Sequence, residues 1–306
     1  MIKYATAALF TIVVAATSLA TAATYTWNTA ATGLNPGSGT NCAGTGVNAV
    51  ACQTTFSSAG QTLIARAYST PVYDTAAPFD VSGKWMEAQI AVYSGNGIGV
   101  RNLNPSDTVS EGSVPEHAID NLGVKDLVVF ELPTGVWDPV SFALGYANTD
   151  SDIQAWVGGA NLGANYDFRN ACFAGTGCSQ LVNDLGFVNI SDGMAAVSGG
   201  TVSPGGASGA GGMNVPTGVA APFATTPNAT GRYLIISGNL GCVQANPDPN
   251  HYGCVGSNGT TADNDFFKIS ALTAATTPPT GVPIPSVLYL VGLGLLTMGR
   301  VRSSRA

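Results

Sequence analysis

The sequence predicts an all-β protein whose strands form an antiparallel β-sandwich, jelly-roll-like in its strand order. Only 9% of the residues are charged while glycine occurs 39 times, a composition that favours short strands and turns over long helices. Stretches rich in β-branched and aromatic residues alternate with polar residues and are separated by Gly, Pro, Asn and Asp. Between the two chain ends no stretch shows a 3.6-residue amphipathic repeat, and regularly spaced short strands are typical of a sandwich.

Seven stretches have the residue pattern of a strand, and together they place one ectodomain over residues 24–280. In chain order they are residues 61–70, 85–93, 126–132, 140–147, 153–159, 232–240 and 265–273. Residues 193–231 differ, because Gly, Ala, Ser, Thr and Pro dominate them. This composition predicts a flexible insertion within the domain.

Residues 1–23 have the composition of an export signal. Lys3 precedes an apolar stretch, and Ala20-Thr21-Ala22 fits the small-x-small rule for cleavage by signal peptidase. We therefore expect cleavage after Ala22, with the mature chain beginning near Ala23 or Thr24. A buried N-terminal helix is the alternative, and it fits this pattern less well.

Six cysteines lie in three closely spaced pairs, which predicts disulfides in an exported chain. We expect each pair to close its own loop. A zinc site is the alternative, but the spacings lack the C-x2-C form and the chain has only two histidines. The predicted pairs are Cys42 with Cys52, Cys172 with Cys178, and Cys242 with Cys254.

Residues 281–306 combine a proline-containing entry, an apolar run and a basic end. As a helix, the run from Ser286 to Gly299 would reach about 21 Å, short of the ~30 Å hydrocarbon core of a membrane. It is therefore marginal as a permanent anchor and sufficient as a transient one. By the positive-inside rule, three residues would remain on the cytoplasmic side, namely Arg300, Arg302 and Arg305.

This tail resembles a PEP-CTERM sorting signal, which bacterial proteins handled by exosortase carry at the C-terminus. The motif here is Val282-Pro283-Ile284-Pro285-Ser286, with Ile284 where the family has Glu. The resemblance implies a Gram-negative, polysaccharide-producing host and a transient inner-membrane intermediate. It also implies that an exosortase-type enzyme removes the tail near Pro285 and that the protein reaches the cell surface or biofilm matrix. A plain tail-anchored protein is the alternative.

A second resemblance, to exosortase-dependent surface proteins, covers roughly residues 85–160. Its segments here are Gly97-Ile98-Gly99-Val100, Pro115-Glu116-His117-Ala118-Ile119-Asp120-Asn121 and Asp150-Ser151-Asp152-Ile153. The resemblance implies family membership and no established enzymatic activity.

The polar residues of these segments have two interpretations. Asp120 and Asn121 can form Asx-turns where the chain reverses into the strand predicted at 126–132. The alternative is a calcium site, because Ca²⁺ takes six to eight oxygen ligands of the carboxylate and amide type. Its predicted ligands are Glu116, Asp120, Asn121, Asp150 and Asp152.

Charge and motif content restrict the function. The net charge of −7 makes a nucleic-acid partner unexpected, because phosphate binding needs clustered Lys and Arg. The chain has no G-x-S-x-G nucleophile motif, and His117 and His251 are its only histidines, so we do not expect an enzyme.

The sequence therefore predicts an exported protein with a structural or adhesive role in a polysaccharide matrix. One alternative is a carbohydrate-binding module, in which aromatic side chains stack on sugars. Another is a surface polysaccharide hydrolase, which needs a pair of carboxyl groups. The candidate stacking residues are Tyr25, Trp27, Trp137, Trp156 and Tyr166.

Overall fold

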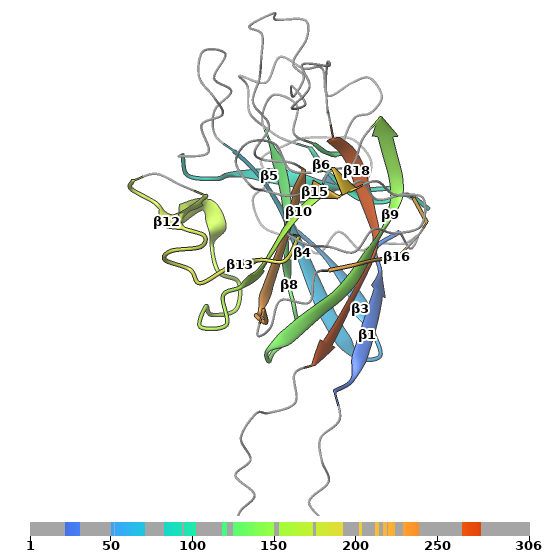
Figure 1. Cartoon of the computed structure of the whole chain (residues 1–306), viewed down its shortest axis with the longest axis horizontal. Helices are drawn as coiled ribbons and strands as arrows, with labels where there is room; N and C mark the ends of the chain where they lie inside the picture. Colours follow the sequence, from blue (N-terminus) through green and yellow to red (C-terminus); the bar gives the residue numbers. More distant parts are fainter. Residues whose placement is uncertain are drawn as a thin grey trace, which may run out of the picture. The chain divides into compact units, whose positions relative to one another are not determined.

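A computed structural model shows an all-β protein, as the sequence predicts (Figure 1). It describes residues 22–30, 50–51, 53–70, 83–93, 95–101, 118–120, 125–149, 153–173, 176–191, 202–203, 212–213, 217–218, 220–223, 229–238 and 265–276. These residues contain one short 3-10 helix, η1 (Phe168–Asn170), and no α-helix. None of their helices is long and apolar enough to cross a membrane. One compact unit runs from Ala23 to Thr277.

The strands are short, as the glycine-rich composition favours. In chain order they are β1 (Thr24–Asn28), β2 (Val50–Ala51), β3 (Gln53–Ser58), β4 (Gln61–Ser69), β5 (Met86–Tyr93), β6 (Gly97–Arg101), β7 (Ile119–Asp120), β8 (Asp126–Glu131), β9 (Trp137–Thr149), β10 (Ile153–Gly158), β11 (Ala171–Cys172), β12 (Ser179–Gln180), β13 (Val188–Asn189), β14 (Val202–Ser203), β15 (Gly212–Met213), β16 (Ala220–Pro222), β17 (Tyr233–Gly238) and β18 (Asp265–Thr276). Each of the seven predicted strands is confirmed, with ends that differ by a few residues. They correspond to β4, β5, β8, β9, β10, β17 and β18.

Fourteen strands form one antiparallel, curled sheet. Its main path is β13-β10-β17-β8-β4-β5-β6-β18-β9-β16, with β1 and β7 added on β18, β2 on β5 and β3 on β4. The sheet changes direction at β5, because residues 86–88 pair with β4 and residues 89–93 pair with β6. We call the part with β3, β4, β8, β10, β13 and β17 the β8 half. The part with β1, β6, β7, β9, β16 and β18 is the β18 half.

The two halves share one hydrophobic core. The β8 half contributes residues such as Leu63, Phe130 and Leu234, and the β18 half contributes Trp27 and Phe267. Alternation along each strand sends these residues to the same side of the sheet. The sheet therefore curls around a single apolar interior.

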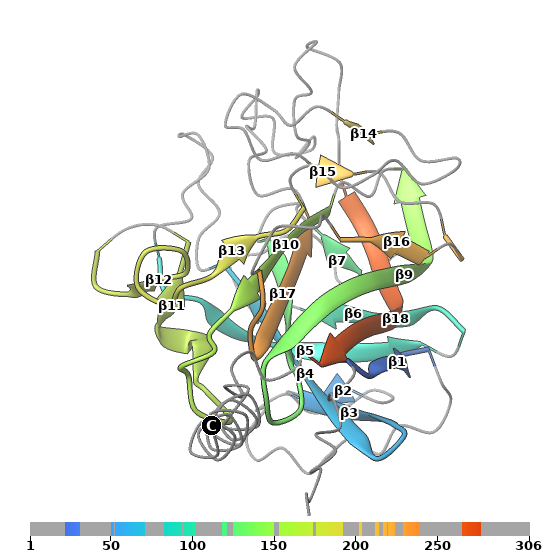
Figure 2. The same cartoon turned by 60° about the horizontal axis from the view of Figure 1, so that its bottom comes forward.

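The β8 half is also covered on its outer face. Residues 160–173 and 176–191, which the sequence did not mark as an element, lie beside β10 and β17 (Figure 2). They carry Phe168, whose ring contacts those of Tyr68, Trp85 and Tyr233 at centroid distances of 5.2–6.0 Å. Because both faces are covered, every residue of β8, β10 and β17 is buried.

A disulfide closes one loop of this covering segment. Cys172 and Cys178 are bonded, with their Cα atoms 5.9 Å apart. The local pairing expected for these two cysteines is thus present in the structure. The other four cysteines lie outside the described residues, namely Cys42, Cys52, Cys242 and Cys254.

Part of the predicted flexible insertion, residues 193–231, belongs to the sheet. Strand β16 pairs with β9, and Ala221 lies opposite Phe142. Ala221 and the following Phe223 are buried in the shared core. The composition of the segment did not indicate this, because two apolar residues among many small ones give no visible alternation.

Candidate functional site

The predicted calcium site is only partly within the described residues. Asp120 lies in β7, where it pairs with Phe266 of β18, and Phe266 pairs on its other side with Asn148 of β9. The register thus brings Asp120 and the end of β9 to the two sides of one β18 residue. The described residues contain no group of three or more His, Cys, Asp or Glu side chains placed to hold a metal. The remaining predicted ligands lie outside them: Glu116, Asn121, Asp150 and Asp152.

Of the predicted processing residues, the structure describes Ala22, which is exposed and directly precedes the compact unit. Both histidines, His117 and His251, lie outside the described residues. So do the residues of the sorting signal, namely Val282, Pro283, Pro285, Ser286, Arg300 and Arg302.

The tryptophans proposed for sugar stacking lie in the interior. Trp27, Trp137 and Trp156 are 0%, 1% and 7% exposed. Trp27 and Trp137 pack edge to face at 5.7 Å in the shared core, and Trp156 packs on Phe173 in the outer layer. These three side chains therefore contribute to stability and do not form an exposed platform.

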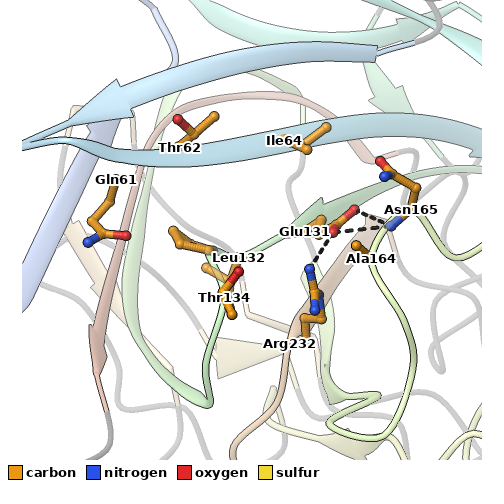
Figure 3. Close-up of a pocket in the computed structure, with 10 residues that line it drawn as sticks. Gln61, Thr62, Ile64, Glu131, Leu132, Thr134, Ala164, Asn165 and Arg232 are labelled. Carbon is orange, nitrogen blue, oxygen red and sulfur yellow. Dashed lines mark hydrogen bonds and ion pairs between the residues drawn. The ribbon is translucent and has the colours of Figure 1, made fainter.

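A pocket of about 380 Å³ opens on the β8 half (Figure 3). The start of β4 forms one wall through Gln61 and Thr62, and the end of β8 with its following turn forms another through Glu131 and Thr134. The loop before η1 and the residue before β17 complete it. Four sequence segments that lie far apart in the chain thus meet at this pocket.

Two of its lining residues, Glu131 and Arg232, form an ion-paired group of three with Arg66, which we call the arginine–glutamate triad. The Glu131 side chain is 4% exposed, and its two oxygens lie 2.9 Å from Arg66 Nη1 and 3.0 Å from Arg232 Nη2. The backbone N–H of Asn165 also donates to both oxygens, at 3.1 and 3.2 Å. Each carboxylate oxygen of Glu131 therefore accepts from one guanidinium group, and both oxygens accept from the same backbone N–H.

The triad follows from strand register. Glu131 at the end of β8 is flanked by Ile64 of β4 and by Tyr233 of β17. Arg66 extends from the next outward-facing position of β4, and Arg232 immediately precedes β17. Arg66 is further fixed by Nη2 donating to Asn165 Oδ1 at 2.6 Å, so the triad also attaches the covering segment to the sheet.

Two guanidinium groups and one carboxylate leave one net positive charge in an acidic protein. Seven of the eleven basic residues lie between residues 24 and 280, and two of these seven meet on Glu131. The Nε of Arg232 is buried and has no hydrogen-bond partner among the described residues. The triad, of which Glu131 and Arg232 line the pocket, therefore carries an excess of positive charge.

Arg66, Glu131 and Arg232 were not among the residues predicted to form a site. A signal was present, because Arg66 and Glu131 interrupt strands that are otherwise largely apolar, in a chain with few charges. A charged residue at a buried strand position is almost always paired. The identity of the partners, however, depended on which strands are neighbours.

A separate polar group lies at the opposite end of β8. Ser69 Oγ donates to Asp126 Oδ1 at 2.8 Å, and Ser237 Oγ donates to the Asp126 carbonyl oxygen at 2.9 Å. In the β18 half, Lys268 Nζ lies 4.6 and 4.2 Å from the ring centroids of Tyr93 and Tyr146. Burial lowers the pKa of Lys268 to about 8. None of these groups lines the pocket.

The burial of Tyr68 beneath the covering segment predicts that the free energy of unfolding depends on pH. Burial raises the pKa of Tyr68 to about 12, above its usual value of 10. The neutral phenol therefore stabilises the fold below pH 10, and this contribution is lost as the pH rises through 12. We expect the free energy of unfolding to fall by about 2–3 kcal/mol more in the wild type than in Tyr68→Phe between these values. Urea unfolding at several pH values measures this, and parallel curves would refute it.

Comparison with protein-family models, with curated proteins and with solved structures finds no match. The protein is therefore described by its fold: it is all-β, with a curled antiparallel sheet. One half of this sheet is covered by a segment that contains a disulfide-closed loop.

Proposed function

We propose that the protein is exported, processed by an exosortase-type enzyme, and acts as a structural or adhesive component of the cell surface or biofilm matrix of a Gram-negative bacterium. The observation that carries this proposal is the pairing of β1 with β18. Thr24 lies opposite Ala275, and the Thr276 N–H donates to the Ala23 carbonyl at 2.9 Å. The points where the predicted signals join the folded unit therefore lie side by side.

This arrangement suits a chain with a sorting signal at each end. The N-terminal signal directs the chain through the membrane, and the C-terminal helix holds it there until cleavage. Because the two ends of the folded unit are adjacent, signal peptidase and the exosortase-type enzyme can both act at one side of it. The rest of its surface then stays clear of the membrane. The Cys172–Cys178 bond supports export, because disulfides persist in oxidising compartments.

We further infer that the curled sheet is a sandwich with jelly-roll-like strand order. Support comes from the shared core, in which the β8 half and the β18 half bury residues against each other. A strand such as β5, which pairs in both halves, is a usual way for a sheet to turn a corner.

The pocket favours binding over hydrolysis. Glycosidases use two carboxyl groups about 5–10 Å apart, one of which must donate a proton. Among the described residues lining the pocket, Glu131 is the single acid, and Arg66, Arg232 and the Asn165 N–H occupy its oxygens. A carbohydrate-binding module is therefore the second candidate.

The sorting step can be tested with the full chain in its producing host. We expect Pro283→Ala with Pro285→Ala to leave the protein in the inner-membrane fraction, because the motif before the helix is altered. The matched control is Pro278→Ala with Pro279→Ala, which changes two prolines outside the motif. If both double variants reach the surface as the wild type does, the sorting proposal is wrong.

We also propose that Ca²⁺ stabilises the loops around the end of β7. The pairing of β7 and β9 on either side of β18 supports this, because Asp120 and Asn148 lie opposite the same β18 residue, Phe266. A ligand at 100 times its dissociation constant adds about 2.7 kcal/mol. We therefore expect EDTA to lower the Tm by several degrees, and Asp152→Ala to abolish that difference while Asp138→Ala keeps it. An unchanged Tm with EDTA would refute the site.

A further inference from the structure

The pocket on the β8 half has the composition of a binding site for a hydroxylated anion. Its volume of about 380 Å³ lies within the range of small-molecule sites. Around the charged triad stand the amide and hydroxyl groups of Gln61, Thr62 and Thr134, which can bond to hydroxyls. Ile64 and Leu132 supply apolar surface between them.

The charge at the pocket favours a carboxylate over a phosphate. The triad, two of whose three members line the pocket, carries one net positive charge, which matches the single negative charge of a carboxylate. A guanidinium binds a planar carboxylate through two parallel N–H bonds. Arg232 lines the pocket; its Nη2 donates to Glu131, and its buried Nε has no acceptor among the described residues.

Glu131 acts here as a positioning residue. By holding Arg66 and Arg232 at 2.9 and 3.0 Å, it fixes the guanidinium groups before a ligand arrives. A side chain that is already ordered loses less conformational entropy on binding. Figure 3 shows Arg232 directed toward Glu131 from the opposite side of the pocket to Thr62.

From these observations we propose that the pocket binds the carboxylate of an acidic sugar, such as a uronic acid unit of a polysaccharide. Arg232 receives the carboxylate, and Gln61, Thr62 and Thr134 bond to the sugar hydroxyls. This binding proposal rests on the proposed matrix location only because the matrix would supply such a polymer. Under it, the ligand of the proposed adhesive role is an acidic polysaccharide.

The test is calorimetric titration of the purified full-length chain with an oligogalacturonide. We expect saturable binding, at least tenfold weaker for Arg232→Gln and weaker in high salt. The matched control is Arg169→Gln, which removes the same charge from an exposed pair with Asp167 and should bind as the wild type does. A neutral galactan and inorganic phosphate serve as comparison ligands.

A second variant covers the case that Arg232→Gln fails to fold. Thr134→Glu adds a carboxylate at an exposed position of the pocket, and we expect it to weaken binding at least tenfold. Val182→Glu adds the same charge elsewhere on the surface and should have no effect.

The proposal is overturned if the wild type does not bind the oligogalacturonide. It is equally overturned if the neutral galactan or phosphate binds as well, or if Thr134→Glu behaves like Val182→Glu. Because this assay uses purified protein, its failure leaves the sorting proposal untouched, and a failure of sorting leaves this result valid.

Discussion

Replacing Glu131 with glutamine is expected to lower the free energy of unfolding by about 3 kcal/mol. Removing one partner of a buried ion pair costs about 3–5 kcal/mol, because the opposite charge is left buried and uncompensated. Here two guanidinium groups lose their partner, although Arg66 and Arg232 retain 11% and 18% of their side-chain exposure, which favours the lower end of the range. For a domain of this size the Tm should fall by roughly 6–12 °C.

The control for Glu131→Gln is Asp167→Asn. Asp167 pairs with Arg169 at 2.7 Å, but both side chains are exposed. Exposed pairs contribute about 0–1 kcal/mol, so this variant should unfold close to the wild type. Differential scanning calorimetry compares the two. If Asp167→Asn destabilised the protein as much as Glu131→Gln does, the triad would not be the attachment point of the covering segment.

Phe168→Ala is expected to have a comparable or larger effect, about 3–5 kcal/mol. The Phe168 side chain is fully buried at the centre of the outer layer, and its ring lies 4.9 Å from Tyr166 and 5.2 Å from Tyr233. Truncation leaves a cavity between the covering segment and the β8 half. The segment should detach locally before the shared core unfolds, since Phe168 is its side chain that contacts Tyr68, Trp85 and Tyr233 together.

Limited proteolysis together with urea unfolding tests the Phe168 prediction. We expect faster cleavage within residues 159–191 in Phe168→Ala, while the strands of the β18 half stay protected. Val182→Ala is the matched control, because Val182 is 53% exposed and its truncation should change stability by less than about 0.5 kcal/mol. Equal cleavage of both variants would contradict the account of the outer layer.

The sequence predicted the strands well and the layers poorly. The seven predicted strands follow from local alternation, which needs no knowledge of partners. Strand β6 was not predicted, because two of its five residues, Gly97 and Gly99, have no side chain to show alternation. Residues 159–191 have no alternation, and their burial comes from aromatic contacts with distant strands.

The candidate site illustrates the same limit. Glu131 is 65 residues from Arg66 and 101 residues from Arg232 in the chain. Their meeting depends on β4 and β17 being the two neighbours of β8, which alternation does not determine. The predicted calcium ligands depend on strand neighbours too, and that prediction stays open to the EDTA experiment.

We propose that the folded unit is delivered to the surface after removal of both terminal signals. Mass spectrometry of the surface-localised protein from its producing host distinguishes the processed from the unprocessed chain. We expect an N-terminus at Ala23 or Thr24, a C-terminus near Pro285, and a peptide pair linked through Cys172 and Cys178. Recovery of surface-localised protein that retains Arg300, Arg302 and Arg305 would contradict it.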